Sequence, residues 1–157
     1  MSLPELPTIN PTDQYRVFRH RGADESNEQL SLLGDPILTA VITDWIITNR
    51  PTWSPGEVSV RMRLQCMLQV VRTALIKGSS VADWTTMYSL DQHIQTSNAN
   101  SSLLVRRSQG AQVAVFKAYV AAVYLKGGFS TVRNWMAGVL SSTVDLEKFD
   151  HPPSQLV

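Results

Sequence analysis

The side chains best suited to chemistry in this 157-residue chain are three histidines and one cysteine, and none has a partner at reactive spacing. His20, His93 and His151 lack the spacing that is typical of a zinc site. No order of serine, histidine and aspartate indicates a nucleophile with its base. The single Cys66 excludes an internal disulfide and is better interpreted as a small buried hydrophobic residue than as a nucleophile. The sequence therefore argues against ordinary hydrolase and zinc chemistry.

Two separate segments carry a more specific pattern. The first reads Asn-Glu-Gln-Leu-Ser-Leu-Leu-Gly-Asp at residues 27–35, and His20-Arg21 precedes it. The second reads Val-Phe-Lys-Ala-Tyr-Val at residues 115–120, followed by Tyr-Leu-Lys-Gly-Gly-Phe at residues 124–129. Together they resemble the two signature stretches of the ribonuclease III family. Those stretches read Asn-Glu-Arg-Leu-Glu-Phe-Leu-Gly-Asp and Asp-Val-Phe-Glu-Ala-Tyr-Ile-Gly, with a later Tyr-Leu-Asp-Gly-Gly-Phe.

The resemblance covers residues 15–136 and is uneven along that range. In its middle, Gly-Glu-Val-Ser at residues 56–59 is similar to a family motif, but Arg61 and Arg63 lie one position out of register. The resemblance implies an all-α, ribonuclease III-like helical domain with a buried central helix that forms dimers. Too few residues follow residue 140 for the double-stranded-RNA-binding domain that typically comes after this domain.

The resemblance fails at the positions that matter for catalysis. The family's four catalytic carboxylates fall on Ser31, Asp35, Ala114 and Lys117, of which only Asp35 is acidic. The family cleaves a phosphodiester with Mg²⁺, a hard cation that takes oxygen ligands in octahedral geometry. A hydroxyl, a methyl group and an ammonium group cannot replace three carboxylates. We therefore expect no bound metal, no other cofactor and no cleavage.

The surviving Asp35 has two interpretations. It is either a remnant that holds a weakly bound ion or a residue whose carboxylate caps the helical turn at Pro36, and the second is favoured. Because the family gathers these positions around one metal, the resemblance also predicts that the Lys117 ammonium pairs with Asp35 in place of the ion.

The first signature segment is also implied to form a subunit interface. Its apolar side chains cover more than the one stripe that a monomer's core requires. The predicted interface residues are Glu28, Leu32, Leu33, Ile37 and Val41. In the family, the residue that matches Leu32 inserts into a pocket of the partner. The partner is expected to be a second copy of the chain or an active relative.

The charge of the chain gives little support to nucleic-acid binding. Its formal net charge is +1, whereas dedicated nucleic-acid modules usually carry a clear basic excess. Arg106, Arg107, Lys126 and Arg133 could contribute to a phosphate-binding surface for double-stranded RNA. The favoured alternative for these four residues is that they are ordinary solvated charges.

Composition indicates a globular protein, with 43% hydrophobic and 17% charged residues. No apolar run reaches the ~20 residues of a membrane helix, since the longest, residues 113–125, contains Lys117. We expect no membrane partner. Residues 1–12 lack the features of a secretory signal or a mitochondrial presequence. An intracellular protein is therefore expected, with a cytoplasmic or nuclear location favoured and a mitochondrial location left open.

Apolar periodicity predicts a helical domain over residues 13–142, between an extended arm at 1–12 and a flexible tail at 143–157. The predicted helices run from Thr12 or Asp13 to Phe18 and over residues 28–49 (with a kink or junction before Pro36), 57–77, 81–94, 103–126 and 131–140. Gly127-Gly128 is expected to stop the fifth helix. The four tryptophans are assigned to core packing or a subunit interface rather than to base stacking.

These patterns support three hypotheses about function. The leading one is an inactive ribonuclease III-like protein that dimerises and binds or competes for structured RNA. The second is a structural component of a ribonucleoprotein such as the mitochondrial ribosome. The third is a metal-dependent endoribonuclease that uses other carboxylates or a partner's.

Overall fold

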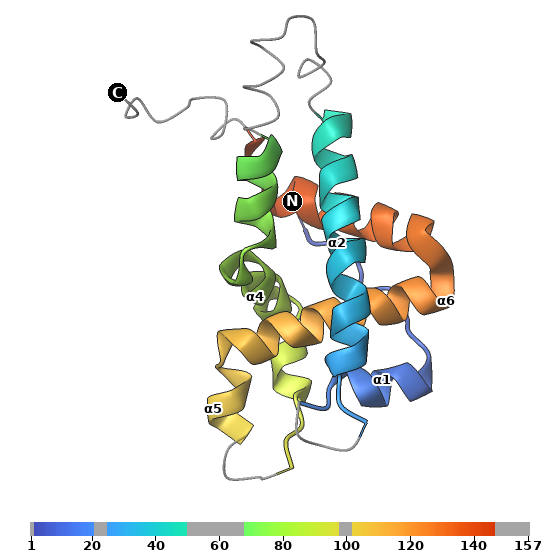
Figure 1. Ribbon diagram of the computed structural model, residues 1–157, viewed down its shortest axis with the longest axis vertical. Coiled ribbons are helices and arrows are strands. Elements are labelled where there is room, and N and C mark those ends of the chain that lie inside the picture. The colour runs from blue at the N-terminus through green and yellow to red at the C-terminus, as the bar shows by residue number, and fades with distance from the viewer. Residues whose placement is uncertain (1, 21–24, 50–67, 98–101, 147–157) are drawn as a thin grey trace, which may run out of the picture.

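The computed structural model describes residues 2–20, 25–49, 68–97 and 102–146, and most of them are helical. The elements are α1 (Pro11–Val17), α2 (Glu28–Asn49), a helical stretch at 68–76, α4 (Gly78–Met87), the 3₁₀ helix η2 (Leu90–His93), α5 (Ser102–Arg106) and α6 (Gln109–Thr143). Within these ranges no strand forms, and one isolated β-bridge joins Arg19 to Gln95. The predicted all-α fold is confirmed (Figure 1).

Helix α6 forms the centre of the fold. Its first half is buried over most of residues 111–123, because apolar side chains occupy nearly every side of the helix. Helix α2 crosses it, and α4 also packs on it (Figure 1). At Gly128 the backbone has φ 74° and ψ 179°, a left-handed region that glycine adopts without a Cβ clash. The helix stop predicted at Gly127-Gly128 is confirmed, and the chain turns back there and continues to Thr143.

An aromatic cluster joins the two halves of α6 to α4. The ring of Trp135 lies 5.7 Å from Phe116, 5.9 Å from Tyr119 and 6.0 Å from Tyr88, and Trp84 lies 5.6 Å from Phe116. All four pairs are tilted, as the quadrupoles of aromatic rings favour. Core packing is confirmed for the described tryptophans, Trp45, Trp84 and Trp135, whereas Trp53 lies outside the described residues, as do Cys66 and His151.

Helix α2 runs through Pro36 as one element, so of the kink or junction predicted before this proline, the junction does not form. Helix α2 is long and apolar enough to cross a membrane by length and composition alone, with a mean hydropathy of 1.5 over its most apolar window. The search for uninterrupted apolar runs in the sequence did not find this helix because polar residues interrupt it. Leu38, Ile42 and Ile46 of this helix are fully buried against the rest of the fold. Its place in the core thus accounts for part of its apolar composition.

Three predicted helix boundaries were wrong, each because a local capping or turn residue redirects the chain. The helix predicted over 103–126 is two helices, since the Ser108 side chain accepts the Ala111 amide at 3.3 Å and begins α6 anew. The helix predicted over 81–94 ends at Met87, because Ser89 adopts a left-handed φ of 56°. The helix predicted to start at residue 81 begins at Gly78 instead, after Lys77 caps it with an extended ψ of 141°.

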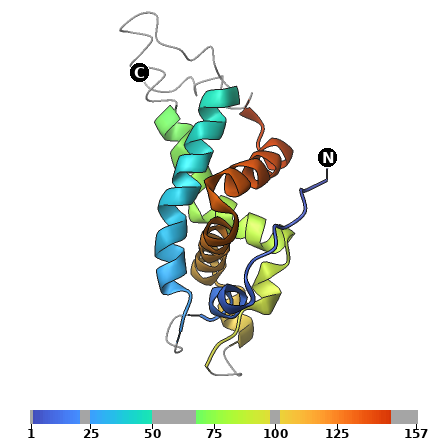
Figure 2. The same cartoon turned by 90° about the vertical axis from the view of Figure 1, so that its right-hand side faces the viewer.

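Residues 2–10 are not helical and lie along the outside of α6 and α4 (Figure 2). We call this segment the N-terminal arm. Its residues Leu6 and Ile9 pack against the core. Helix α1 follows it and begins at Pro11, one residue before Thr12 and two before Asp13, the two predicted starts.

Candidate functional site

The crossing of α2 and α6 brings together the four positions at which the sequence pattern places catalytic carboxylates. Ser31 and Asp35 are four residues apart on α2, and Ala114 and Lys117 are three apart on α6, so each pair shares one helix face. Ser31 and Ala114 line the same cavity. Asp35 and Lys117 form an ion pair. The predicted site residues are therefore neighbours in space.

Gly34 sets the distance between the two helices at this point. A Cβ atom built on Gly34 would lie 1.8 Å from the backbone carbonyl oxygen of Lys117, which no side-chain rearrangement could relieve. Only a residue without a side chain allows the α2 backbone to approach so closely. This approach places Asp35, the next residue, beside the Lys117 side chain.

The ion pair between Lys117 and Asp35 confirms the pairing predicted from the sequence. The Lys117 side chain is only 19% exposed, whereas the Asp35 side chain is 48% exposed, so the pair lies at the edge of the core. The long lysine stem is covered by protein and its ammonium reaches the outer edge, where the carboxylate meets it. The remaining negative charge at the site is thereby neutralised by a side chain.

A cavity of about 720 Å³ opens next to this pair. It is lined by the start of α2, including Glu28, Gln29, Ser31 and Leu32, by the first turn of α6, and by His20 and Asn27. Asn27 has a structural role there. Its buried side-chain amide donates to the Val17 backbone carbonyl at 3.1 Å, and its backbone carbonyl accepts the Ser31 backbone amide at 2.8 Å. Of these lining residues, the sequence analysis had not singled out Gln29 or the first turn of α6.

The sequence comparison decides how this geometry is to be interpreted. Residues 15–143 match the family model described as Ribonuclease-III-like, which is most of the chain. The chain belongs to the ribonuclease-III-like family. The resemblance carried by the two signature segments is therefore confirmed, and it extends slightly beyond residues 15–136.

Proteins named Ribonuclease 3 from bacteria are among the relatives of this ribonuclease-III-like chain. It is 28% identical over 118 residues to Ribonuclease 3 of Chlamydia trachomatis serovar L2, covering 75% of this chain and 47% of the relative. It is 28% identical over 145 residues to Ribonuclease 3 of Azotobacter vinelandii, covering 89% and 59%. The chain thus spans about half the length of these curated relatives.

Solved structures confirm the ribonuclease III fold. The nuclease domain of ribonuclease III from Campylobacter jejuni superposes with a TM-score of 0.72 at 18% identity, covering 87% of this chain and 88% of that domain. Dicer from Pichia stipitis superposes with a TM-score of 0.65 at 22% identity, covering 95% of this chain and 61% of that one.

The residues at this site do not fit the divalent metal that the ribonuclease III family implies. Ser31 offers a neutral hydroxyl, Ala114 offers no donor atom, and the Lys117 ammonium already occupies the Asp35 carboxylate. Across the described ranges, no group of three or more histidine, cysteine, aspartate or glutamate side chains is placed to hold an ion. A hard cation needs several oxygen ligands, and this donor set supplies one carboxylate that is already paired.

The predicted interface face of α2 is exposed at only some of its positions. Leu32 is 76% exposed and Leu33 is 38% exposed, and Glu28 also lies on the surface. Ile37 is partly buried against the core. Val41 is 1% exposed, so its inclusion in an interface was wrong, because its side chain is buried in the core of the monomer.

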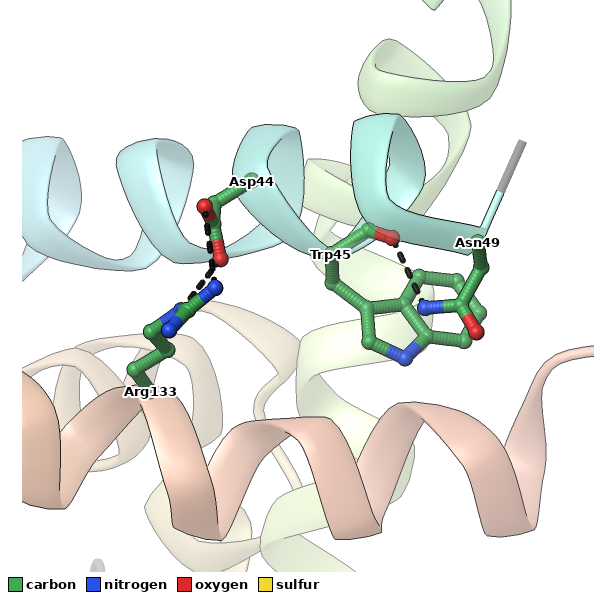
Figure 3. A network of polar contacts seen from close by, with 4 residues as sticks. All are labelled: Asp44, Trp45, Asn49 and Arg133. Carbon is green, nitrogen blue, oxygen red and sulfur yellow. Dashed lines mark hydrogen bonds and ion pairs between the residues drawn. The ribbon is translucent and has the colours of Figure 1, made fainter. Parts of the chain in front are cut away.

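Three of the four predicted RNA-contacting cations have partners within the chain. Arg106 donates to the Ile94 carbonyl at 3.2 Å, and Lys126 donates to the Thr8 hydroxyl at 2.8 Å. Arg133 pairs with Asp44 of α2, with Nε 2.5 Å from Oδ2 (Figure 3). Figure 3 also shows Asn49 donating to the Trp45 carbonyl one turn further along α2.

Helix geometry separates these cations further. The rise of α6 puts its first residue, Gln109, which follows Arg107 by two residues, about 26 Å from Lys126. Three of the four side chains thus bind partners within the protein, and a phosphate-binding surface formed by all four stays a prediction.

The position of Lys117 leads to a testable difference from metal-binding sites. Lys117→Glu would place a second carboxylate beside Asp35, and the two like charges should destabilise the fold unless a cation joins them. We expect Mg²⁺ to raise the melting temperature of Lys117→Glu by roughly 2–4 °C, equivalent to about 1 kcal/mol. At the same ionic strength it should leave the natural chain unchanged.

Lys117→Gln is the matched control, since it removes the ammonium without adding a carboxylate, and it should show no response to Mg²⁺. Thermal unfolding followed by circular dichroism measures all three proteins. A natural chain that Mg²⁺ stabilises as strongly as Lys117→Glu would contradict the assignment, because Asp35 would then be holding a metal.

Proposed function

We propose that this protein is a ribonuclease III-like domain that has lost cleavage and retains the ability to dimerise and to bind structured RNA. The observation that carries this proposal is the ion pair between Lys117 and Asp35, which places a cation of the chain itself where the family's chemistry requires a metal. Ser31 and Ala114, at the other two positions, cannot compensate for that change. The protein would then act by occupying double-stranded RNA, or by pairing with an active relative.

The retained architecture supports a role that depends on shape. Three positions keep structural functions that a fold without a role would not need. Gly34 permits the close helix crossing, Asn27 anchors a loop, and Gly128 allows the tight reversal of the chain. Leu32 and Leu33 remain exposed on α2, where a soluble monomer gains nothing from large apolar side chains. A neighbouring structure from Campylobacter jejuni is described as having a region involved in dimer formation. We propose that the start of α2 serves that purpose here.

A cleavage assay tests the catalytic half of the proposal. Purified protein with Mg²⁺ or Mn²⁺ is expected to release no product from end-labelled double-stranded RNA above a buffer blank, because three carboxylate positions are replaced. Metal-dependent products with two-nucleotide 3′ overhangs that Asp35→Ala abolishes would overturn it. Ser31→Glu, Ala114→Asp and Lys117→Glu combined should restore traces of activity, whereas each alone should not, since catalytic groups that act as a unit are strongly non-additive.

Solution mass and RNA binding test the other half. Fluorescence anisotropy with a labelled RNA duplex is expected to show binding that weakens as salt rises, because phosphate contacts release counterions. Light scattering of the same samples reports whether a dimer carries the RNA. A protein that binds no duplex and joins a larger particle instead would favour the structural role in a ribonucleoprotein over the one proposed.

A further inference from the structure

The backbone of the N-terminal arm is bound by two tyrosine side chains, in addition to the bond from Lys126 to the Thr8 hydroxyl. The Tyr88 hydroxyl donates to the Pro4 carbonyl at 2.8 Å, and the Tyr119 hydroxyl donates to the Pro7 carbonyl at 2.7 Å. Trp135 in turn donates its indole N–H to the Tyr88 oxygen at 3.2 Å, which orients that hydroxyl. Two tyrosines of the aromatic cluster thus serve as donors to an extended strand.

The spacing of the two bonded carbonyls matches a polyproline II helix. Pro4 and Pro7 are three residues apart in the sequence Pro-Glu-Leu-Pro, and three residues make one turn of that helix. The proline rings fix φ, and the residue before each proline is restricted to extended conformations. Asn10, which precedes Pro11, has φ −68° and ψ 144°, as this conformation requires. Because a polyproline II strand has no internal hydrogen bonds, its carbonyls are available to outside donors.

The surface beneath the arm is shaped for proline. A Cβ atom on Gly138 would lie 3.0 Å from the ring of Pro4, so the bare glycine makes room for that ring. Burial raises the pKa of both Tyr88 and Tyr119; for Tyr88 the hydrogen bond from Trp135 acts in the opposite direction, and for Tyr119 the neighbouring Tyr88 adds to the rise. Both hydroxyls therefore remain protonated donors around neutral pH.

The arm does not fill this surface. A cavity of about 670 Å³ remains between residues 6–9 of the arm and the side chains of Phe18, Tyr88, His93 and Tyr119. A second proline-rich strand could bind in the same way and carry larger side chains after its second proline. Those side chains would occupy the part of this cavity that Thr8 and Ile9 leave open. The Tyr88 and Tyr119 hydroxyls bind backbone carbonyls of the arm, and any proline-rich strand presents such carbonyls.

We propose that the groove formed by Tyr88, Tyr119, Trp135 and Gly138 is a recognition site for a proline-rich segment of another protein, which the N-terminal arm occupies in cis. Proline-rich ligands are recognised elsewhere in this way, by aromatic-lined grooves that exploit a preformed strand. The preferred ligand has two prolines three residues apart, with an apolar residue before the second, as in the arm. The arm regulates access, since a tethered strand has an effective concentration in the millimolar range.

The test uses the full chain and a fluorescein-labelled peptide with the arm sequence Ser-Leu-Pro-Glu-Leu-Pro-Thr-Ile-Asn. Pro4→Ala/Pro7→Ala in the protein should weaken the arm's own docking, because alanine loses the preset φ and the ring contact with Gly138. This variant is expected to bind the peptide about tenfold more tightly than the natural chain does, since two prolines are lost. Peptide with alanine at both proline positions should bind at least tenfold more weakly.

Tyr88→Phe/Tyr119→Phe in the same background should lower peptide affinity by about tenfold or more, because it deletes both donors. Tyr124→Phe is the matched control on α6 and should leave the affinity unchanged, since this hydroxyl lies outside the groove. Equal affinity with and without the two groove hydroxyls, in variants that circular dichroism shows to be folded, would overturn the proposal.

A measurement on the natural chain covers the case in which the proline variant does not fold. Millimolar unlabelled peptide should shift the amide resonances of the arm in an ¹⁵N-labelled sample, because the peptide displaces the arm from Tyr88 and Tyr119. Unmoved resonances would overturn the proposal. The natural chain could instead form a dimer that excess peptide dissociates and that the Tyr88→Phe/Tyr119→Phe variant does not form. That result would mean that the groove binds the arm of a second copy, and it would also overturn the proposal.

Discussion

Gly34→Ala is expected to destabilise the protein by about 3–5 kcal/mol, near the upper end of what single substitutions do. The added methyl group would sit 1.8 Å from the Lys117 carbonyl oxygen, and both atoms belong to helical backbones that cannot rotate away. Relief requires α2 and α6 to separate, which opens the packing between these two helices. Interiors packed at crystal-like density tolerate such a shift poorly.

Urea or thermal unfolding followed by circular dichroism gives this number, and Gly110→Ala is the matched control. Gly110 lies in the first turn of α6, where an added Cβ would meet only the Ser108 hydroxyl at 3.8 Å. Alanine there should be neutral or should stabilise by up to about 1 kcal/mol through helix propensity. A Gly34→Ala protein within about 1 kcal/mol of the natural chain would mean that the helix crossing is looser than the structure has it.

Leu32→Asp is expected to convert a dimer into a monomer at micromolar concentration. Leu32 is 76% exposed in the isolated chain, so the substitution costs the monomer's fold little, while an unpaired carboxylate buried in a partner's pocket should cost several kcal/mol of association. Each 1.4 kcal/mol changes the dissociation constant tenfold. The effect should therefore be visible as a loss of mass without a loss of melting temperature.

Leu104→Asp is the matched control for this experiment. Leu104 is 77% exposed on α5, so it carries the same chemistry at another part of the surface and should leave the mass unchanged. Multi-angle light scattering over a concentration series reads both variants and the natural chain. A natural chain whose mass stays at 17.5 kDa throughout would end the dimer proposal.

The sequence predicted the parts of this fold that depend on local patterns. The all-α class, the buried first half of α6 and the stop at Gly127-Gly128 follow from apolar periodicity and from glycine, and all three are confirmed. The pairing of Lys117 with Asp35 was predictable because a charge replaced a metal ligand within a recognisable motif. In each case the signal lies within a few turns of one helix or in one motif.

What the sequence could not give depends on contacts between distant segments. Val41 looked like an interface residue because periodicity cannot tell which side of a broadly apolar helix meets the core. Arg133 looked available for RNA because nothing local indicates that Asp44, 89 residues earlier, neutralises it. The bond from Tyr119 to Pro7 spans 112 residues and leaves no periodic trace at either end.

The ion pair at the centre of the site also changes what the protein's surroundings can control. A site that depends on dissolved Mg²⁺ gains stability by mass action and therefore varies with the free ion concentration. The Lys117 ammonium is covalently attached to α6, so it has no dissociation constant and no concentration. An active ribonuclease III would lose its magnesium on dilution, on addition of a chelator or when nucleotides compete for the ion. The positive charge beside Asp35 would stay in place under the same conditions.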